Sequence, residues 1–223
     1  MAAKARGERA CVRHVPSHEA GRAVKEKKTL TASEQDPEAR AAWWQIATQF
    51  EPNKLVFVDE AGTHTAMTRT HARAPKGQRA YGSVPRNRGG NLTLLAALSS
   101  NRFQAEWLIE GSVDGDVFVT WLKHVLLPTL IPGQIVVMDN LRAHYRKEVS
   151  ALIEAHGRSL LYLPPYSPDF SPIELAFSEI KRQLKSLAAR SKQTLTAAVA
   201  QACRTINPAD VVGWFRHCGY NLQ

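Results

Sequence analysis

The stretch YLPPYSPDFSPIE, residues 162–174, has four prolines in thirteen residues and runs directly into the helical pattern LAFSEIKRQLKSLAAR. Each proline fixes the backbone angle φ and removes one N–H donor, so the stretch cannot pair as a central strand or enter a helix before Pro172. Its stiffness also lowers the entropy that is lost on ordering. We therefore predict a rigid connector that leaves a strand at residues 159–163 and delivers Glu174 to the first turn of a helix.

Glu174 has two interpretations. Ser171-Pro172-Ile173-Glu174 matches a capping box, in which Ser171 is the N-cap and the Glu174 carboxylate only binds the Ser171 amide. In the second interpretation Glu174 is a metal ligand that must be placed accurately relative to distant strands. The rigid connector favours the ligand, because a cap needs only local residues.

Two aspartates share one context. Asp59 follows LVFV and Asp139 follows IVVM, so each is predicted at the C-terminal end of a buried strand. In open α/β sheets, ligand sites form outside those strand ends. Two neighbouring carboxylates repel each other unless a cation lies between them, and a divalent ion with oxygen ligands fits that role. The alternative for each residue is an ordinary turn acid. The 34 residues between Asp139 and Glu174 leave room for a helix, a strand and the connector.

The rest of the chain predicts an α/β fold. The segments 91–100 (NLTLLAALSS) and 102–111 (RFQAEWLIEG) have a hairpin pattern. Helical patterns are found from about Pro37 and at 114–130, 146–157, 173–190 and 195–206. Strands that are separated by helices pair in parallel, whereas a hairpin adds antiparallel edges. We therefore predict a mixed sheet flanked by helices.

The charge balance suits a polyanionic partner. The chain has 29 Lys and Arg against 20 Asp and Glu, a net charge of +9, and nucleic acid is the commonest partner of such a surface. Three distant cysteines argue against a disulfide framework or a zinc site and fit a reducing cytosol. We find neither a secretory signal nor an apolar run long enough for a membrane span, so we expect a cytoplasmic, nucleoid-associated protein.

Two basic stretches are candidates for DNA binding. Residues 69–90 contain six Lys and Arg, no acid, and Tyr81 among the arginines, with Gly and Pro that predict a loop or hairpin tip. The second stretch lies on the helix that begins near Glu174. The candidate residues are Arg69, Arg73, Lys76, Arg79, Arg86, Arg88, Lys181, Arg182 and Lys185. The alternative is that both stretches are merely solvated.

Three acidic blocks carry a resemblance to a known family. FVDE (57–60), VVMDNLRAH (136–144) and LLYLPPYSPDFSPIELAFSEIK (160–181) resemble the catalytic domain of DDE transposases, in the bacterial insertion-sequence branch related to mariner. The segments 66–99 and 214–220 (WFRHCGY) resemble the same group, so the resemblance covers roughly residues 28–220.

The resemblance implies a ribonuclease-H-like fold with a five-stranded mixed sheet. It implies a catalytic triad of Asp59, Asp139 and Glu174 that holds two Mg²⁺ or Mn²⁺ ions, with Asp59 bridging both. Asn140 and His144 fill an Asp-Asn-x-x-x-His pattern, and Glu60 matches a position that is usually acidic; all three are expected to be supporting residues. The implied activity is cleavage and strand transfer on double-stranded DNA, at transposon ends and target, by a homodimer.

Full-length relatives carry a helix-turn-helix region before the catalytic domain, whereas only about fifty residues precede Asp59 here. We therefore expect residues 1–50 to be a basic arm with a short helix, a remnant of the linker region, and residues 51–223 to be the catalytic domain. Two other functions stay open. One is a catalytically silent truncated transposase that binds DNA or the full-length enzyme as an inhibitor. The other is a host nuclease acting on RNA–DNA hybrids, against which the proline-rich block argues.

Overall fold

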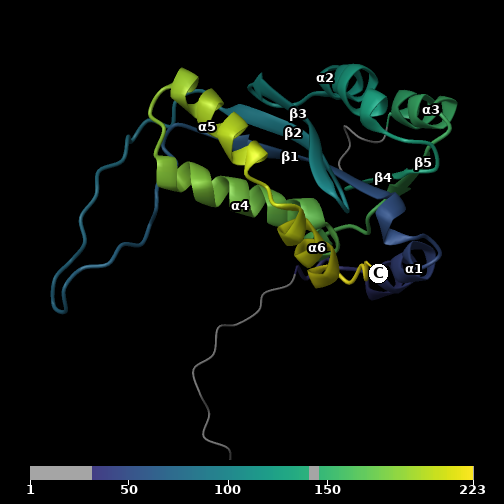
Figure 1. Ribbon diagram of the computed structural model, residues 1–223, viewed down its shortest axis with the longest axis horizontal. Coiled ribbons are helices and arrows are strands. Elements are labelled where there is room, and N and C mark those ends of the chain that lie inside the picture. Colours follow the sequence, from purple (N-terminus) through teal and green to yellow (C-terminus); the bar gives the residue numbers. More distant parts are fainter. Residues whose placement is uncertain (1–31, 141–145, 223) are drawn as a thin grey trace, which may run out of the picture. The chain divides into compact units, whose positions relative to one another are not determined.

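Five strands form one mixed sheet in the order β3-β2-β1-β4-β5, in a computed structural model that describes residues 32–140 and 146–222 (Figure 1). The strands are β1 (Leu55–Thr63), β2 (Leu92–Ser99), β3 (Arg102–Glu110), β4 (Ile135–Met138) and β5 (Ser159–Tyr162). β2 and β3 form the expected antiparallel hairpin, and β2 pairs antiparallel with β1. β4 pairs parallel with both β1 and β5. The predicted α/β fold with a mixed five-stranded sheet is confirmed.

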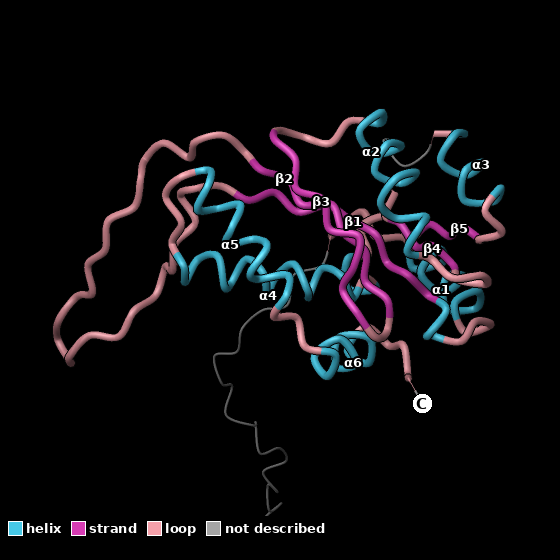
Figure 2. Tube along the Cα trace, turned by 45° about the horizontal axis from the view of Figure 1, so that its top comes forward, coloured by secondary structure: helices cyan, strands magenta, loops and turns pink. Residues whose placement is uncertain are grey.

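Helices pack on both faces of this sheet (Figure 2). The helices are α1 (Pro37–Ala47), α2 (Gly115–Trp121), α3 (Lys147–Ala155), α4 (Pro172–Leu187), α5 (Lys192–Arg204) and α6 (Pro208–His217). Side chains alternate along β1 between two cores. Leu55 and Phe57 belong to a core that includes α1, α4, α5 and α6, whereas Val56 and Val58 belong to a core that includes α2 and α3. This alternation decides which helices face each catalytic candidate.

Three elements differ from the sequence-based expectation. The helical pattern at 114–130 is an α-helix only over α2 and continues as a π-helix at Leu122–Leu126 and a 3-10 helix at Leu127–Thr129. β1 does not end at Asp59 but continues to Thr63, because β2 pairs with it along this whole length and places Asp59 opposite Ala96. The helix α6 was not predicted. Its signals are local, since the Asn207 side chain accepts a hydrogen bond from the Ala209 amide at 2.9 Å and Pro208 occupies the first helical position.

Residues 1–31, which hold most of the expected basic arm, and His144 lie outside the described residues. The short helix expected from Pro37 is α1, and its Trp43 is buried in the same core as Phe57 of β1. Across residues 32–140 and 146–222, no helix combines the length and the apolar character that crossing a membrane requires.

Candidate active site

Asp59 and Asp139 occupy equivalent positions on neighbouring parallel strands. The pairing of β1 with β4 ends at Val58 opposite Met138, so the two aspartates are the next residues on each strand. Neighbouring strands lie about 4.8 Å apart, which brings two carboxylates into one small region. The expectation that strand ends gather these acids therefore needs one correction. Only β4 ends there, whereas β1 runs on beside β2.

Glu174 reaches the same region from α4. Leu55, Phe57 and Ala61 of β1 face the core that contains α4, and Asp59 lies on the same side by alternation. α4 begins at Pro172, which places Glu174 in its first turn. Asp59, Asp139 and Glu174 line one cleft of about 470 Å³, together with Asn140 and the proline-rich segment. The structure thus brings three carboxylates from β1, the end of β4 and α4 to one place.

The hydrogen bonds around Ser171 bear on the two interpretations of Glu174. A capping box requires a free Ser171 amide, but that N–H donates to the Pro168 carbonyl at 3.0 Å. The Ser171 side chain makes no cap hydrogen bond within the described part of the chain. The helix start therefore uses backbone turns and Pro172, and the Glu174 carboxylate is left to the cleft.

Asp59 lies at the centre of the negative charge. It is only 8% exposed, and burial raises its pKa well above the ordinary value, with further upward contributions from the Glu174 and Asp139 carboxylates. One interaction opposes this, because the Glu60 amide donates to Asp59 Oδ1 at 2.7 Å and favours the charged form. Burial and the neighbouring carboxylates thus disfavour the charged form of Asp59, and a cation bound in the cleft would offset this effect.

The donor set fits Mg²⁺ or Mn²⁺, because both are hard ions that prefer carboxylate and amide oxygens. Asp59, Asp139, Glu174 and Asn140 supply such oxygens in the cleft. Among the described residues, however, no group of three or more His, Cys, Asp or Glu side chains is already arranged to hold a metal ion. The backbone thus brings the candidate ligands to one cleft.

We predict that Asp59→Asn stabilises the metal-free protein at neutral pH. The folded state binds a proton at Asp59 more tightly than the unfolded chain does, so this residue lowers stability as pH rises above the unfolded pKa. Asparagine removes that loss. In EDTA the variant should melt at a higher temperature than wild type at pH 7.5, with the difference vanishing near pH 4. A lower melting temperature at pH 7.5 would mean that the Asp59 charge stabilises the fold.

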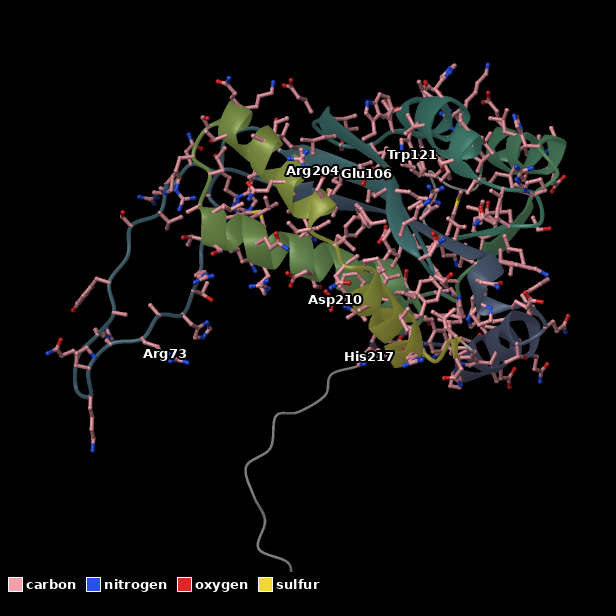
Figure 3. All side chains as sticks on the ribbon, in the orientation of Figure 1. Arg73, Glu106, Trp121, Arg204, Asp210 and His217 are labelled. Carbon is pink, nitrogen blue, oxygen red and sulfur yellow. The ribbon has the colours of Figure 1, made fainter. Side chains whose placement is uncertain are left out.

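The expected DNA-binding residues fall into two groups. Figure 3 shows Arg73 on the long segment between β1 and β2, whose residues 69–90 are exposed. The base of this segment is held by Arg190, which donates to the Thr65 and Met67 carbonyls at 2.9 Å. On α4, Lys185 is exposed, whereas Arg182 is already engaged by Glu179 through two contacts of 2.6 Å. DNA contact by either group stays a prediction.

Comparison with known proteins supports one family. A family model described as DDE superfamily endonuclease matches residues 54–196, a range that contains all three acids. No curated protein matches the sequence. Among solved structures, the pre-cleavage Mos1 transpososome is similar with a TM-score of 0.70 at 15% identity, covering 90% of this chain and 64% of that chain. The mariner Mos1 paired end complex with Mg gives 0.68 at 16% identity, covering 92% and 65%.

The catalytic domain of Mos1 mariner transposase by itself gives a TM-score of 0.59 at 12% identity, covering 86% of this chain and 91% of that domain. At these identities the likeness shows the fold, and the expected fold class is confirmed. The chain spans less than two thirds of the length of the Mos1 chain in the pre-cleavage complex, 64%, but most of the length of the isolated catalytic domain.

Proposed function

This chain belongs to the DDE superfamily endonuclease family, and on that premise we propose that it is the catalytic domain of a DNA transposase that cleaves and joins DNA strands with divalent metal ions. The observation that carries the proposal is the convergence of Asp59, Asp139 and Glu174 on one cleft. The resemblance of the three acidic blocks further supports an assignment to the insertion-sequence branch.

The three carboxylates have distinct places in this mechanism. Asp59 is buried close enough to Glu174 and Asp139 for both carboxylates to raise its pKa, and the three residues would together hold the two ions. When bound, two Mg²⁺ or Mn²⁺ ions activate the attacking oxygen and neutralise charge on the leaving oxygen in an in-line phosphoryl transfer. Asn140 lines the same cleft and offers an amide to the substrate or to a carboxylate. Glu60 follows Asp59 and supports it through its backbone amide.

Double-stranded DNA is the proposed substrate. The solved Mos1 structures include a paired-end complex with the left transposon end and a strand transfer complex, so we propose transposon ends and target DNA as partners, bound by a homodimer. Lys and Arg in the segment 69–90 and on α4 would contact phosphates. Such contacts supply affinity and position the DNA, but they do not read its sequence.

A nicking assay tests the proposal. Supercoiled plasmid carrying a transposon end is incubated with the protein and Mg²⁺, Mn²⁺ or EDTA. We expect nicked product with either ion and none in EDTA. Binding of the plasmid without cleavage under any ion would favour the silent inhibitor. Faster cleavage of an RNA–DNA hybrid than of duplex DNA would favour the host nuclease.

A further inference from the structure

Residues 164–171, which lie between β5 and α4, contribute to one wall of the cleft, and we call them the cleft loop. Its only regular element is the short 3-10 turn Pro168–Phe170. Glu174 follows this loop by three residues, in the first turn of α4. The cleft loop therefore leads directly into the helical turn that carries Glu174, so its conformation contributes to the position of that carboxylate relative to Asp59 and Asp139.

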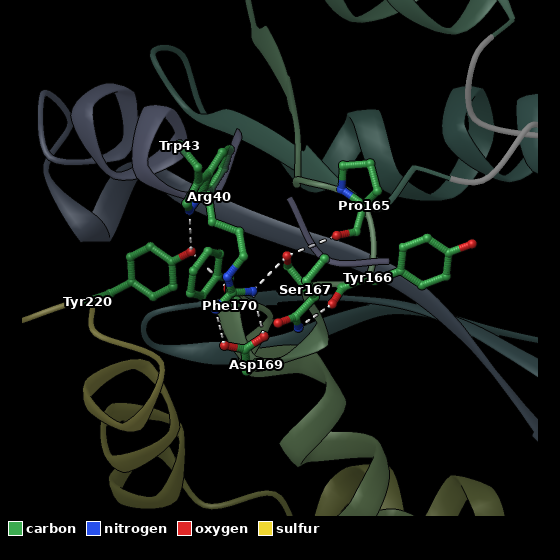
Figure 4. A network of polar contacts seen from close by, with 9 residues as sticks. Arg40, Trp43, Pro165, Tyr166, Ser167, Asp169, Phe170 and Tyr220 are labelled. Carbon is green, nitrogen blue, oxygen red and sulfur yellow. Dashed lines mark hydrogen bonds and ion pairs between the residues drawn. The ribbon is translucent and has the colours of Figure 1, made fainter. Parts of the chain in front are cut away.

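Arg40 of α1 holds the middle of the cleft loop (Figure 4). Its Nη1 donates to Ser167 Oγ at 2.7 Å and to Asp169 Oδ1 at 3.0 Å, and its Nη2 donates to Asp169 Oδ2 at 2.7 Å. Its guanidinium carbon also lies 3.9 Å from the centre of the Phe170 ring. The two parallel contacts to Asp169 are the geometry that gives arginine–carboxylate pairs their directional strength. The pairing lowers the pKa of Asp169 below its usual value, as expected for a carboxylate that accepts charged hydrogen bonds.

Two further side chains hold the ends of the cleft loop. Gln35 donates to the Tyr166 carbonyl at 2.7 Å, and the Tyr220 hydroxyl donates to the Phe170 carbonyl at 2.8 Å. Tyr166 has a φ of +54°, a conformation that non-glycine residues rarely adopt unless their surroundings impose it. The chain near Tyr220 is itself fitted to α1. Gly219, with a φ of +92°, leaves no room for a Cβ atom, which would meet the Trp44 ring at 2.7 Å.

The contacts from outside the cleft loop fall on the residues that are not proline. Pro164, Pro165 and Pro168 restrict their own backbone, which leaves the loop freedom at its other residues. The outside contacts fall on those other residues, namely Tyr166, Ser167, Asp169 and Phe170. Prolines and outside contacts together thus restrain every residue from 164 to 170. The three residues that hydrogen-bond to these positions from outside the loop, Gln35, Arg40 and Tyr220, lie outside the range 54–196 that the family model matches.

We propose that Arg40 is a positioning residue for DNA cleavage, which holds the cleft loop so that Glu174 faces Asp59 and Asp139. The proposal rests on the function proposed above, because it concerns the same three acids. Arg40 touches neither the three carboxylates nor the cleft itself; it acts through Ser167 and Asp169. An ordinary surface ion pair would contribute little to stability and would leave the cleavage rate unchanged. A residue that positions the metal ligand Glu174 should instead change the rate of DNA cleavage.

The test compares two arginine variants. In Arg40→Ala we expect the cleavage rate at saturating DNA to fall about 10- to 100-fold, the usual penalty for a misplaced catalytic group, with DNA affinity in EDTA within about twofold of wild type. Arg158→Ala is the matched control. Arg158 directly precedes β5 and lies at the opposite end of that strand from the cleft loop. Its side chain donates a hydrogen bond to the Leu130 carbonyl at 2.8 Å. It should cost stability but keep the wild-type rate.

Hydrogen exchange supplies a readout that does not depend on activity. The Phe170 and Ser171 amides are bonded within the cleft loop, to Ser167 and Pro168, at 3.1 and 3.0 Å. In Arg40→Ala both amides should exchange faster, whereas in Arg158→Ala they should not. Arg40→Lys keeps the positive charge but cannot make the two parallel hydrogen bonds to Asp169. Its cleavage rate should therefore lie between those of wild type and Arg40→Ala. The double variant Arg40→Ala/Asp169→Asn should be no slower than Arg40→Ala, because both changes break one interaction.

Several results would overturn the proposal. Wild-type cleavage by Arg40→Ala, or an equal loss of rate in Arg158→Ala, would mean that Arg40 only stabilises the fold. Should alanine prevent folding, the rate of Arg40→Lys decides, and a wild-type rate there counts against the proposal. A wild-type protein that never cleaves DNA would refute the proposed function. The exchange of the Phe170 and Ser171 amides would still decide whether Arg40 restrains the cleft loop.

Discussion

Replacing Asp139 with asparagine is expected to slow metal-dependent DNA cleavage by at least about 1000-fold, which corresponds to about 4 kcal/mol of activation free energy. Asparagine has nearly the same shape as aspartate, so the residue after β4 should keep its place beside Asp59. What is lost is the negative charge that would hold one ion. The fold and the affinity for DNA in EDTA should stay close to those of wild type.

The matched control for Asp139→Asn is Asp210→Asn. Asp210 is an exposed aspartate in the first turn of α6 and does not line the cleft (Figure 3). Both variants remove one negative charge, so a general effect of charge would appear in both. Melting curves and DNA binding in EDTA establish that each variant is folded. Near-normal cleavage by Asp139→Asn would show that another residue holds the ion, and the assignment of the triad would be wrong.

Neutralising the basic segment 69–90 is expected to have the second largest effect. We predict that changing its six Lys and Arg to Gln lowers the affinity for DNA at 50 mM salt by at least on the order of 1000-fold. Each phosphate contact releases condensed counterions and adds about 0.9 to the slope of log affinity against log salt. The six substitutions should therefore reduce that slope by up to about five. Melting temperature should change little, because these residues are exposed.

A pair of triple variants separates contact from net charge. Arg73, Lys76 and Arg79 lie in the middle of the segment, and their change to Gln should reduce the slope by about three. Lys123, Lys147 and Arg204 are exposed on other elements, α3 and α5 among them, and their change to Gln alters the net charge equally. If both triple variants weaken binding alike, the segment makes no particular contact with DNA and only the overall charge matters.

The central elements of the fold follow from local patterns. The apolar runs before Asp59 and Asp139 predict buried strands, and they are the two parallel neighbours β1 and β4. The proline-rich stretch predicts a connector that delivers Glu174 to the first turn of a helix, and α4 begins at Pro172. These predictions succeed because strand burial and helix starts depend on residues close in sequence.

The remaining features depend on contacts between distant residues. β1 runs past Asp59 because β2 pairs with it from residue 92 onward, which the composition of β1 does not reveal. Arg40 meets Asp169 across 129 positions, and Tyr220 meets the Phe170 carbonyl across 50. No sequence pattern around an arginine on a short helix indicates which distant residue it will contact. α6 is different, because its Asn207-Pro208 start is a local sequence signal for the N-terminus of a helix.

Anomalous X-ray diffraction at the manganese edge is the most direct test of the central claim, that Asp59, Asp139 and Glu174 together hold the catalytic ions. Crystals of the protein would be grown with DNA and Mn²⁺, from wild type and from Asp139→Asn. We expect one or two manganese peaks bounded by the three carboxylates in wild type, with at least one of them lost in the variant. Manganese bound elsewhere, with no peak among the three carboxylates in the presence of DNA, would contradict it.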